Sequence, residues 1–168
     1  MAAIRSALCL LLVLAALAAD DALGFIFSSS SSRSSSSRGG GQQPPRFSHD
    51  IGTRSGLTSL YNSRVTHAEH WERPLGSSSV MFGPFRHSGV VVTTDTGDRW
   101  LIHKGDGYGR SSQTVVTRAG HMSPRWRQVE GHDVSGSSLA DYVRAGGANY
   151  GIATDNCHHG RCRMMGLP

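Results

Sequence analysis

The sequence is poor in cysteine, in aromatic residues and in long apolar runs. Only three of its 168 residues are cysteines, aromatic residues make up 7% and hydrophobic residues 38%. No apolar run reaches the length that a helix needs to cross a bilayer. The chain also has no Asn-x-Ser/Thr acceptor, so N-glycosylation is not expected. These averages are lowered by the first third of the chain, and apolar content is ordinary after about residue 80.

The charge of the chain is basic without the pattern of a nucleic-acid-binding protein. The formal net charge is +5 and the sequence pI is near 9.6. Weak attraction to anionic polymers or lipid surfaces is therefore expected. No run of lysine and arginine is interleaved with aromatic residues, so the sequence predicts no specific nucleic-acid partner.

The first third of the chain is typical of a secretory signal followed by a tether. Arg5 precedes an apolar run, and small residues at 16–18 suit signal cleavage, so residues 1–19 are predicted to be a signal peptide. Residues 20–53 are rich in serine, arginine and glycine, which predicts a disordered tether. The protein is therefore expected to be secreted. With Cys9 in the signal, Cys157 and Cys162 remain as an even pair in an oxidising compartment.

Residues 54–168 are predicted to form one small α+β domain. Apolar residues at three- and four-residue spacing predict a helix over 56–71, ended by Pro74. After it, β-branched and aromatic runs separated by glycine, aspartate or proline predict an antiparallel meander. Its strands are expected at 80–85 with 87–94, 99–104, 113–118 and 126–130. Two short helices should follow, one from Ser137 or Ser138 to Arg144 and one over 157–165.

The turn after Thr94 decides where two histidines point. A three-residue loop with Gly97 in the left-handed conformation is a common hairpin closure, and it pairs Thr94 with Asp98. The numbers of paired residues then always add up to 192, which places His103 opposite Gly89. In that register His87 and His103 lie diagonally on one face, about 7 to 8 Å apart between backbones. Gly89 is expected to leave room for a helix terminus to approach.

A cysteine stands where the last predicted helix begins. If Asn156 caps this helix, Cys157 lies in its first turn, where backbone N–H groups favour a thiolate. Cys157 and Cys162 within one helix have Cα atoms about 8 to 9 Å apart, too far for a disulfide, so the helix and that disulfide exclude each other. Zinc bound by Cys157, Cys162 and an adjacent histidine is a further alternative, although the spacing matches no common zinc module.

Three short motifs resemble a known family. They are His87-Ser88-Gly89-Val90-Val91, the run Trp100-Leu101-Ile102-His103, and Asn156-Cys157-His158-His159, in that chain order. They are similar to the permuted papain-like thiol enzymes, particularly lecithin:retinol acyltransferase-like proteins and their NlpC-type relatives. The resemblance implies a permuted papain-like arrangement with His87 as general base, His103 as its orienting residue and Cys157 as the nucleophile that forms an acyl-enzyme.

Two functions from different classes follow from the sequence. The first is a secreted cysteine-dependent hydrolase or acyltransferase that acts on an amide or ester bond through an acyl-thioester, without a cofactor. The second is a secreted, non-catalytic matrix or binding protein with a structural pair, Cys157 and Cys162. The sequence indicates no substrate.

Overall fold

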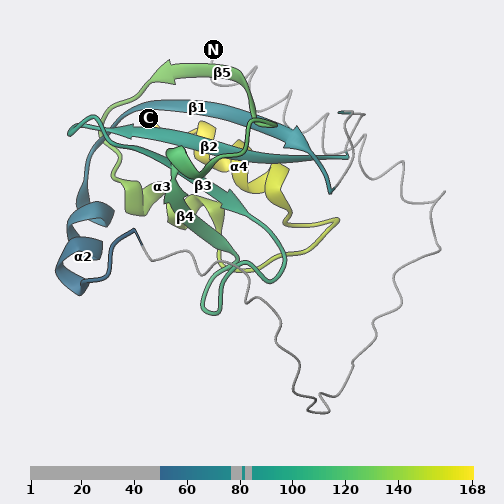
Figure 1. Cartoon of the computed structure of the whole chain (residues 1–168), viewed down its shortest axis with the longest axis horizontal. Helices are drawn as coiled ribbons and strands as arrows, with labels where there is room; N and C mark the ends of the chain where they lie inside the picture. Colours follow the sequence, from purple (N-terminus) through teal and green to yellow (C-terminus); the bar gives the residue numbers. More distant parts are fainter. Residues whose placement is uncertain (1–49, 77–80, 82–84) are drawn as a thin grey trace, which may run out of the picture.

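The protein has one antiparallel sheet with helices packed on it, which confirms the predicted α+β class (Figure 1). The computed structural model describes residues 50–76, 81 and 85–168. The predicted signal peptide and all but the last four residues of the predicted tether lie outside these described residues. Within them the folded unit already includes Asp50, whose carboxylate accepts a hydrogen bond of 3.2 Å from the backbone N–H of Arg118.

Five strands form the sheet in the spatial order β4-β3-β2-β1-β5. The strands are β1 (Val65–Pro74), β2 (Arg86–Thr94), β3 (Arg99–Lys104), β4 (Thr114–Arg118) and β5 (Arg127–Asp133). The first four follow each other as an antiparallel meander, and β5 returns to pair with β1 at the opposite edge. The predicted meander is therefore confirmed for β2 to β4. Of the predicted strand 80–85, residues 80 and 82–84 lie outside the described residues, and residues 81 and 85 are not in a strand.

The predicted helix over 56–71 is wrong in its second half. The helix α2 spans Arg54–Asn62 and ends at Ser63, whose backbone is extended. The chain then continues as β1, in which buried and more exposed residues alternate from Ala68 onward. The helical spacing of the apolar residues is coincidental. The alternation typical of a strand is hidden in the sequence, because two buried positions of β1 hold polar side chains, His70 and Glu72.

The β2–β3 hairpin has the predicted turn and register. The backbone N–H of Thr94 donates to the carbonyl of Asp98 at 2.9 Å, and Gly97 has a left-handed φ of 84°. The pairs run from Thr93 with Arg99 to Gly89 with His103. This register confirms the expectation that His103 lies opposite Gly89.

The two faces of the sheet carry different clusters of buried side chains. One face holds the main core, which includes Val90, Val92 and Ile102 and continues into both C-terminal helices. The other face holds a smaller cluster made by Val91, Leu101 and Trp126. Because successive side chains of a strand point to opposite faces, this division assigns every residue of β2 and β3 to a face.

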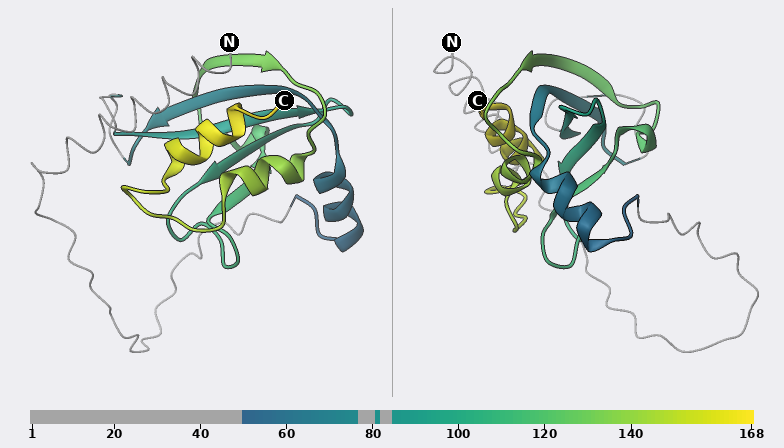
Figure 2. Two further views of the ribbon diagram at one scale, coloured as in Figure 1. Left: turned by 180° about the vertical axis from the view of Figure 1, so that it is seen from behind. Right: turned by 90° about the vertical axis from the view of Figure 1, so that its left-hand side faces the viewer.

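The two C-terminal helices lie side by side across the main-core face (Figure 2). The helix α3 spans Leu139–Gly146 and is capped by Ser138 in a capping box with Asp141, as the sequence predicted for its start. The helix α4 spans Cys157–Met165 and is capped by Asn156, which confirms the predicted helix over 157–165. No helix in the described residues is long and apolar enough to cross a membrane.

Replacing Gly97 tests the turn on which the register depends. Gly97→Ala should lower the free energy of unfolding by about 1 kcal/mol, because an L side chain is disfavoured in the left-handed region. No atom lies within 4 Å of a β-carbon built at this position, so the cost is conformational and not steric. Urea denaturation of the full chain measures it.

Gly120→Ala is the matched control for this substitution. A β-carbon at Gly120 also meets no atom within 4 Å, but the residue lies in a 3-10 helix at Ala119–His121 without a left-handed φ. Its effect should stay within about 0.5 kcal/mol. Equal effects of the two substitutions would show that the turn conformation does not matter.

Candidate functional site

Two histidine rings contact each other at one end of the sheet. Nε2 of His87 lies 3.0 Å from Nδ1 of His103, and the ring centroids are 5.3 Å apart. The hairpin register produces this contact, because His103 opposes Gly89 and His87 lies two residues further along the same face. The expectation that these two histidines meet is confirmed.

Burial keeps this histidine pair uncharged at neutral pH. Loss of solvent lowers the pKa of His87 to about 3, and the nearby charges of His103, Arg73 and His158 act in the same direction. Burial also lowers the pKa of His103 to about 4, again helped by Arg73. One ring nitrogen in the contact must therefore donate and the other accept.

Two aromatic side chains enclose the pair. The Tyr108 ring lies 5.1 Å from His103 and 5.8 Å from His87, and the Trp126 ring lies 5.5 Å from His87, all measured between centroids. Tyr108 reaches this place because Gly105 has no side chain: a β-carbon there would approach the tyrosine ring within 2.3 Å. The sequence had placed Trp126 only at the start of a predicted strand, and it gave no signal for Tyr108.

Cys157 begins α4 as a buried free thiol. Burial raises the pKa of its thiol, whereas the backbone N–H groups of Ser88, His158 and Cys157 itself favour the thiolate. The sulfur therefore lies against β2 at the residue that follows His87. In the described part of the chain, no hydrogen bond joins this sulfur to either ring of the histidine pair.

The thiol and the histidine pair approach the end of the sheet from its two sides. The body of α4 packs on the main-core face, whereas His87 and His103 share the face of Leu101 and Trp126. Pairing between β2 and β3 stops at Gly89, although β2 continues to Arg86 beside β1. The sheet is therefore open beside residues 87 and 88, where the start of α4 meets it.

Tyr150 lies near both Cys157 and the aromatic side chains beside the histidine pair. The pKa of Tyr150 is raised by burial and by the closeness of Cys157, Tyr108 and Asp106. Tyr108 is one of the two aromatic side chains that enclose the histidine pair. The thiol, the two tyrosines and the imidazoles thus gather at one end of the sheet.

Gly89 has a different role from the one expected. A β-carbon at this position would meet Cδ1 of Leu101 at 2.9 Å and Cβ of His103 at 3.0 Å. The missing side chain therefore makes room for neighbours on β3, and not for the terminus of a helix. This space allows His103 to lie across β2 and reach His87.

Ser88 and His158 hold the start of α4 against β2, and sequence reasoning missed this contact. The hydroxyl oxygen of Ser88 lies 2.6 Å from Nδ1 of His158. Glu72, on the next strand, lies 3.5 Å from the same hydroxyl and is itself paired with Arg86 at 2.9 Å. His159 instead completes the capping box with Asn156. The adjacent histidines therefore position the helix.

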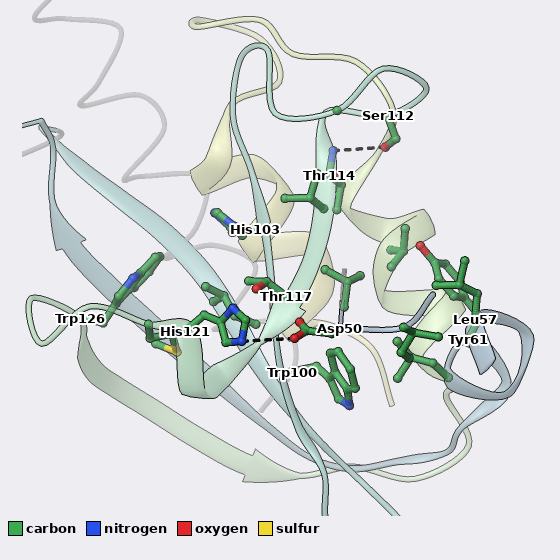
Figure 3. Close-up of a pocket in the computed structure, with 18 of the residues that line it drawn as sticks. Asp50, Leu57, Tyr61, Trp100, His103, Ser112, Thr114, Thr117, His121 and Trp126 are labelled. Atoms are coloured by element: carbon green, nitrogen blue, oxygen red, sulfur yellow. Dashed lines mark hydrogen bonds and ion pairs between the residues drawn. The ribbon is translucent and has the colours of Figure 1, made fainter. Parts of the chain in front are cut away.

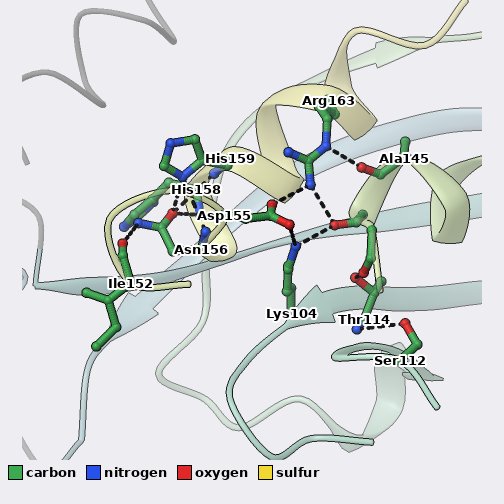
Figure 4. A network of polar contacts seen from close by, with 12 residues as sticks. Lys104, Ser112, Thr114, Ala145, Ile152, Asp155, Asn156, His158, His159 and Arg163 are labelled. Atoms are coloured by element: carbon green, nitrogen blue, oxygen red, sulfur yellow. Dashed lines mark hydrogen bonds and ion pairs between the residues drawn. The ribbon is translucent and has the colours of Figure 1, made fainter. Parts of the chain in front are cut away.

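A buried ion pair between Lys104 and Asp155 fixes the segment before α4 (Figure 4). Nζ of Lys104, whose side chain is 0% exposed, lies 2.6 Å from Asp155 and donates to the carbonyl of Gly146 at 3.0 Å. Arg163 reaches the same carboxylate and the same carbonyl, each at 2.7 Å. Burial alone would raise the pKa of Asp155, but Lys104 and Arg163 hold it below its ordinary range.

The disulfide between Cys157 and Cys162, which the sequence left open as an alternative to the helix, is not formed. Both residues lie in α4, and Cys157 is a free cysteine. Regular helical geometry keeps residues five apart beyond bridging distance, as the sequence argument required. Among the described residues, no group of three or more histidine, cysteine, aspartate or glutamate side chains is arranged to hold a metal ion, including the set considered for zinc.

An open cavity of about 770 Å³ is lined in part by His103 and wraps around the edge strand β4 (Figure 3). His103 and Trp126 line one end of it, and Leu57 and Tyr61 line the other, with β4 between them. The end beside the histidines also includes Arg73. A substrate in this end would lie next to the imidazole of His103.

No protein-family model, curated protein or solved structure matches the chain in the three comparisons. The candidate site is therefore defined by its own geometry.

The two partners of the buried ion pair, Lys104 and Asp155, should contribute unequally to the free energy of unfolding. Asp155→Asn leaves the ammonium of Lys104 buried without a countercharge, so we expect a loss of about 3 kcal/mol in the free energy of unfolding. Lys104→Met removes the buried charge and leaves Asp155 with Arg163 and solvent, so the loss should be about 1 kcal/mol. Urea denaturation at pH 7 decides the order, and a larger loss for Lys104→Met would contradict the argument.

The histidine pair should make the protein less stable in mild acid. In the unfolded chain both histidines take up protons below pH about 6.5, whereas in the folded chain they stay neutral down to pH about 4 and 3. Stability is therefore complete above pH 6.5 and falls by up to about 1.4 kcal/mol per pH unit for each histidine as the pH decreases towards 4.

A double substitution isolates this effect. Glutamine does not titrate, so His87→Gln with His103→Gln should flatten the dependence of unfolding free energy on pH between 6.5 and 4. The two proteins should be compared by urea denaturation across that range. An unchanged slope would mean that the pair does not stay neutral in the folded protein.

Proposed function

We propose that this protein is a secreted, cysteine-dependent hydrolase or acyltransferase with a permuted papain-like arrangement, acting on an amide or ester bond. The observation that carries the proposal is the contact of 3.0 Å between Nε2 of His87 and Nδ1 of His103. This contact lies beside Ser88, whose backbone N–H interacts with the sulfur of Cys157. A base oriented by a second polar group and a thiol at a helix start are the parts that thiol catalysis needs.

The tautomers of the histidine pair follow from these roles. To accept a proton from the thiol, Nδ1 of His87 must be unprotonated, so its Nε2 carries the hydrogen and donates it to Nδ1 of His103. His103 is then protonated on its own Nε2. The second histidine thereby fixes the ring of the first and exposes its basic nitrogen.

The resting thiol and imidazole are both uncharged, because burial raises the pKa of Cys157 and lowers that of His87. The proton of the thiol passes to Nδ1 of His87 as sulfur attacks the carbonyl carbon. The tetrahedral intermediate then expels the amine or alcohol, which takes that proton from His87, and leaves an acyl-thioester on Cys157. Water releases the acyl group as an acid, or an acceptor amine or alcohol takes it.

Backbone groups at the start of α4 suit the charge that develops during this attack. The Asn156 side chain accepts hydrogen bonds from the backbone N–H groups of His158 and His159, at 2.9 and 3.2 Å. We expect the N–H of Cys157 itself to stabilise the oxyanion, which develops on the carbonyl oxygen of the tetrahedral intermediate bonded to this cysteine. The helix dipole adds to this stabilisation.

An electrophilic acyl probe tests the proposal. The folded, reduced protein should be acylated at Cys157, as located by mass spectrometry of the digested chain. His87→Gln should reduce the acylation rate by about 100-fold or more, because a positioned base contributes roughly that factor. His103→Gln should also reduce it, through loss of the ring orientation.

His67→Gln is the control, since His67 is bound to Asp133 at 2.7 Å on another part of the sheet. It should leave the rate unchanged. No acylation of the folded wild-type protein, or equal acylation in His87→Gln, would reject the enzyme and favour a non-catalytic binding protein.

A further inference from the structure

Arg73 lines the cavity together with His103 and lies across from His87 on the neighbouring strand. The β1–β2 register places Arg73 directly across from His87. Its guanidinium carbon lies 5.5 Å from the centroid of the Trp126 ring, and Nη1 donates to the neighbouring carbonyl of Pro74 at 3.2 Å. In the described part of the chain Arg73 forms no ion pair. A guanidinium has five N–H donors, so most of them are available to a ligand.

Other arginines of the sheet and helices differ from Arg73 in this respect. Each of three is bound to a carboxylate: Arg86 to Glu72, Arg99 to Glu69 and Arg163 to Asp155. These ion pairs give each of the three arginines a structural role. Arg73 has no such explanation within the described residues, and it lines the cavity together with His103.

The groups that face the histidine pair add no negative charge. Arg73 faces it from β1, His158 from α4, and Tyr108 from the segment after β3. No carboxylate is among the described groups that shift the pKa of either ring. The cavity end is therefore positive and partly aromatic, which suits an anion.

We propose that the substrate carries an anionic group, a carboxylate or a phosphate, close to the scissile carbonyl, and that Arg73 binds this group beside His87. This substrate class rests on the proposed thiol chemistry. The guanidinium can hold either anion through paired hydrogen bonds. Arg73 thereby selects the substrate and places its carbonyl at the open end of the sheet.

Binding of the anion also strengthens the base. Burial is the main cause of the low pKa of His87, but the positive charge of Arg73 adds to it. An anion on the guanidinium offsets that charge and raises the pKa of both histidines. His87 thus becomes a better proton acceptor when the substrate is in place.

Titration of the histidine rings by NMR tests the anion site without any catalysis. Inorganic phosphate should raise the pKa of His87 and His103 in the full chain by about one unit. Sodium acetate, in a separate arm, shows whether a carboxylate acts in the same way, and the anion with the larger effect identifies the group. Arg73→Gln should raise both pKa values without phosphate and abolish the response to it.

Arg99→Gln is the matched control, because Arg99 lies on the same sheet face but is paired with Glu69. It should keep the response to phosphate. No response in the wild-type protein, or the same response in Arg73→Gln, would overturn the proposal.

Two probes separate this proposal from the proposed function. They share one activated acyl group, and one carries a free carboxylate where the other carries the amide. The carboxylate probe should acylate Cys157 at least tenfold faster, and Arg73→Gln should remove the difference while Arg73→Lys keeps part of it. Equal rates in the wild-type protein overturn the substrate class alone, whereas no acylation by either probe overturns the thiol chemistry on which it rests.

Discussion

A three-residue turn between β2 and β3 decides which side chains meet at the end of the sheet. With Gly97 in the left-handed region, Gly89 pairs with His103, and the histidine reaches diagonally to His87. A turn longer by one residue would shift the pairing and move His103 to the other face of the sheet. The candidate site therefore depends on the backbone conformation of a turn that lies at the far end of both strands.

The second requirement is a fixed start for α4. Lys104 is the last residue of β3, directly after His103, and its buried ammonium binds Asp155, two residues before Cys157. Burying this charge is costly, and the carbonyl of Gly146 and the carboxylate together offset the cost. One strand thus carries His103 on one face and, on the other, Lys104, which anchors the start of α4.

The sequence predicted the parts of this structure that rest on local rules. The hairpin turn, the strands β2 to β4, the caps at Ser138 and Asn156, and the contact of the two histidines all follow from turn and capping chemistry.

The parts that rest on long-range contacts could not be predicted in the same way. The strand β1 resembled a helix because its inward positions hold His70 and Glu72, which pair with each other and, through Glu72, with Arg86 of β2. Likewise, the contacts of three other residues form only when β1, β2 and α4 come together: Arg73, Ser88 and His158. No periodicity in one segment reports such contacts.

The tautomer of His87 is the most direct test of the account, because the proposed chemistry needs an unprotonated Nδ1 facing the thiol. Long-range ¹H–¹⁵N correlation spectra of the full chain at pH 7 report the protonation of each ring nitrogen. The account predicts a neutral His87 with its hydrogen on Nε2, donated to Nδ1 of His103. A hydrogen on Nδ1 of His87, or a charged ring at this pH, would contradict it.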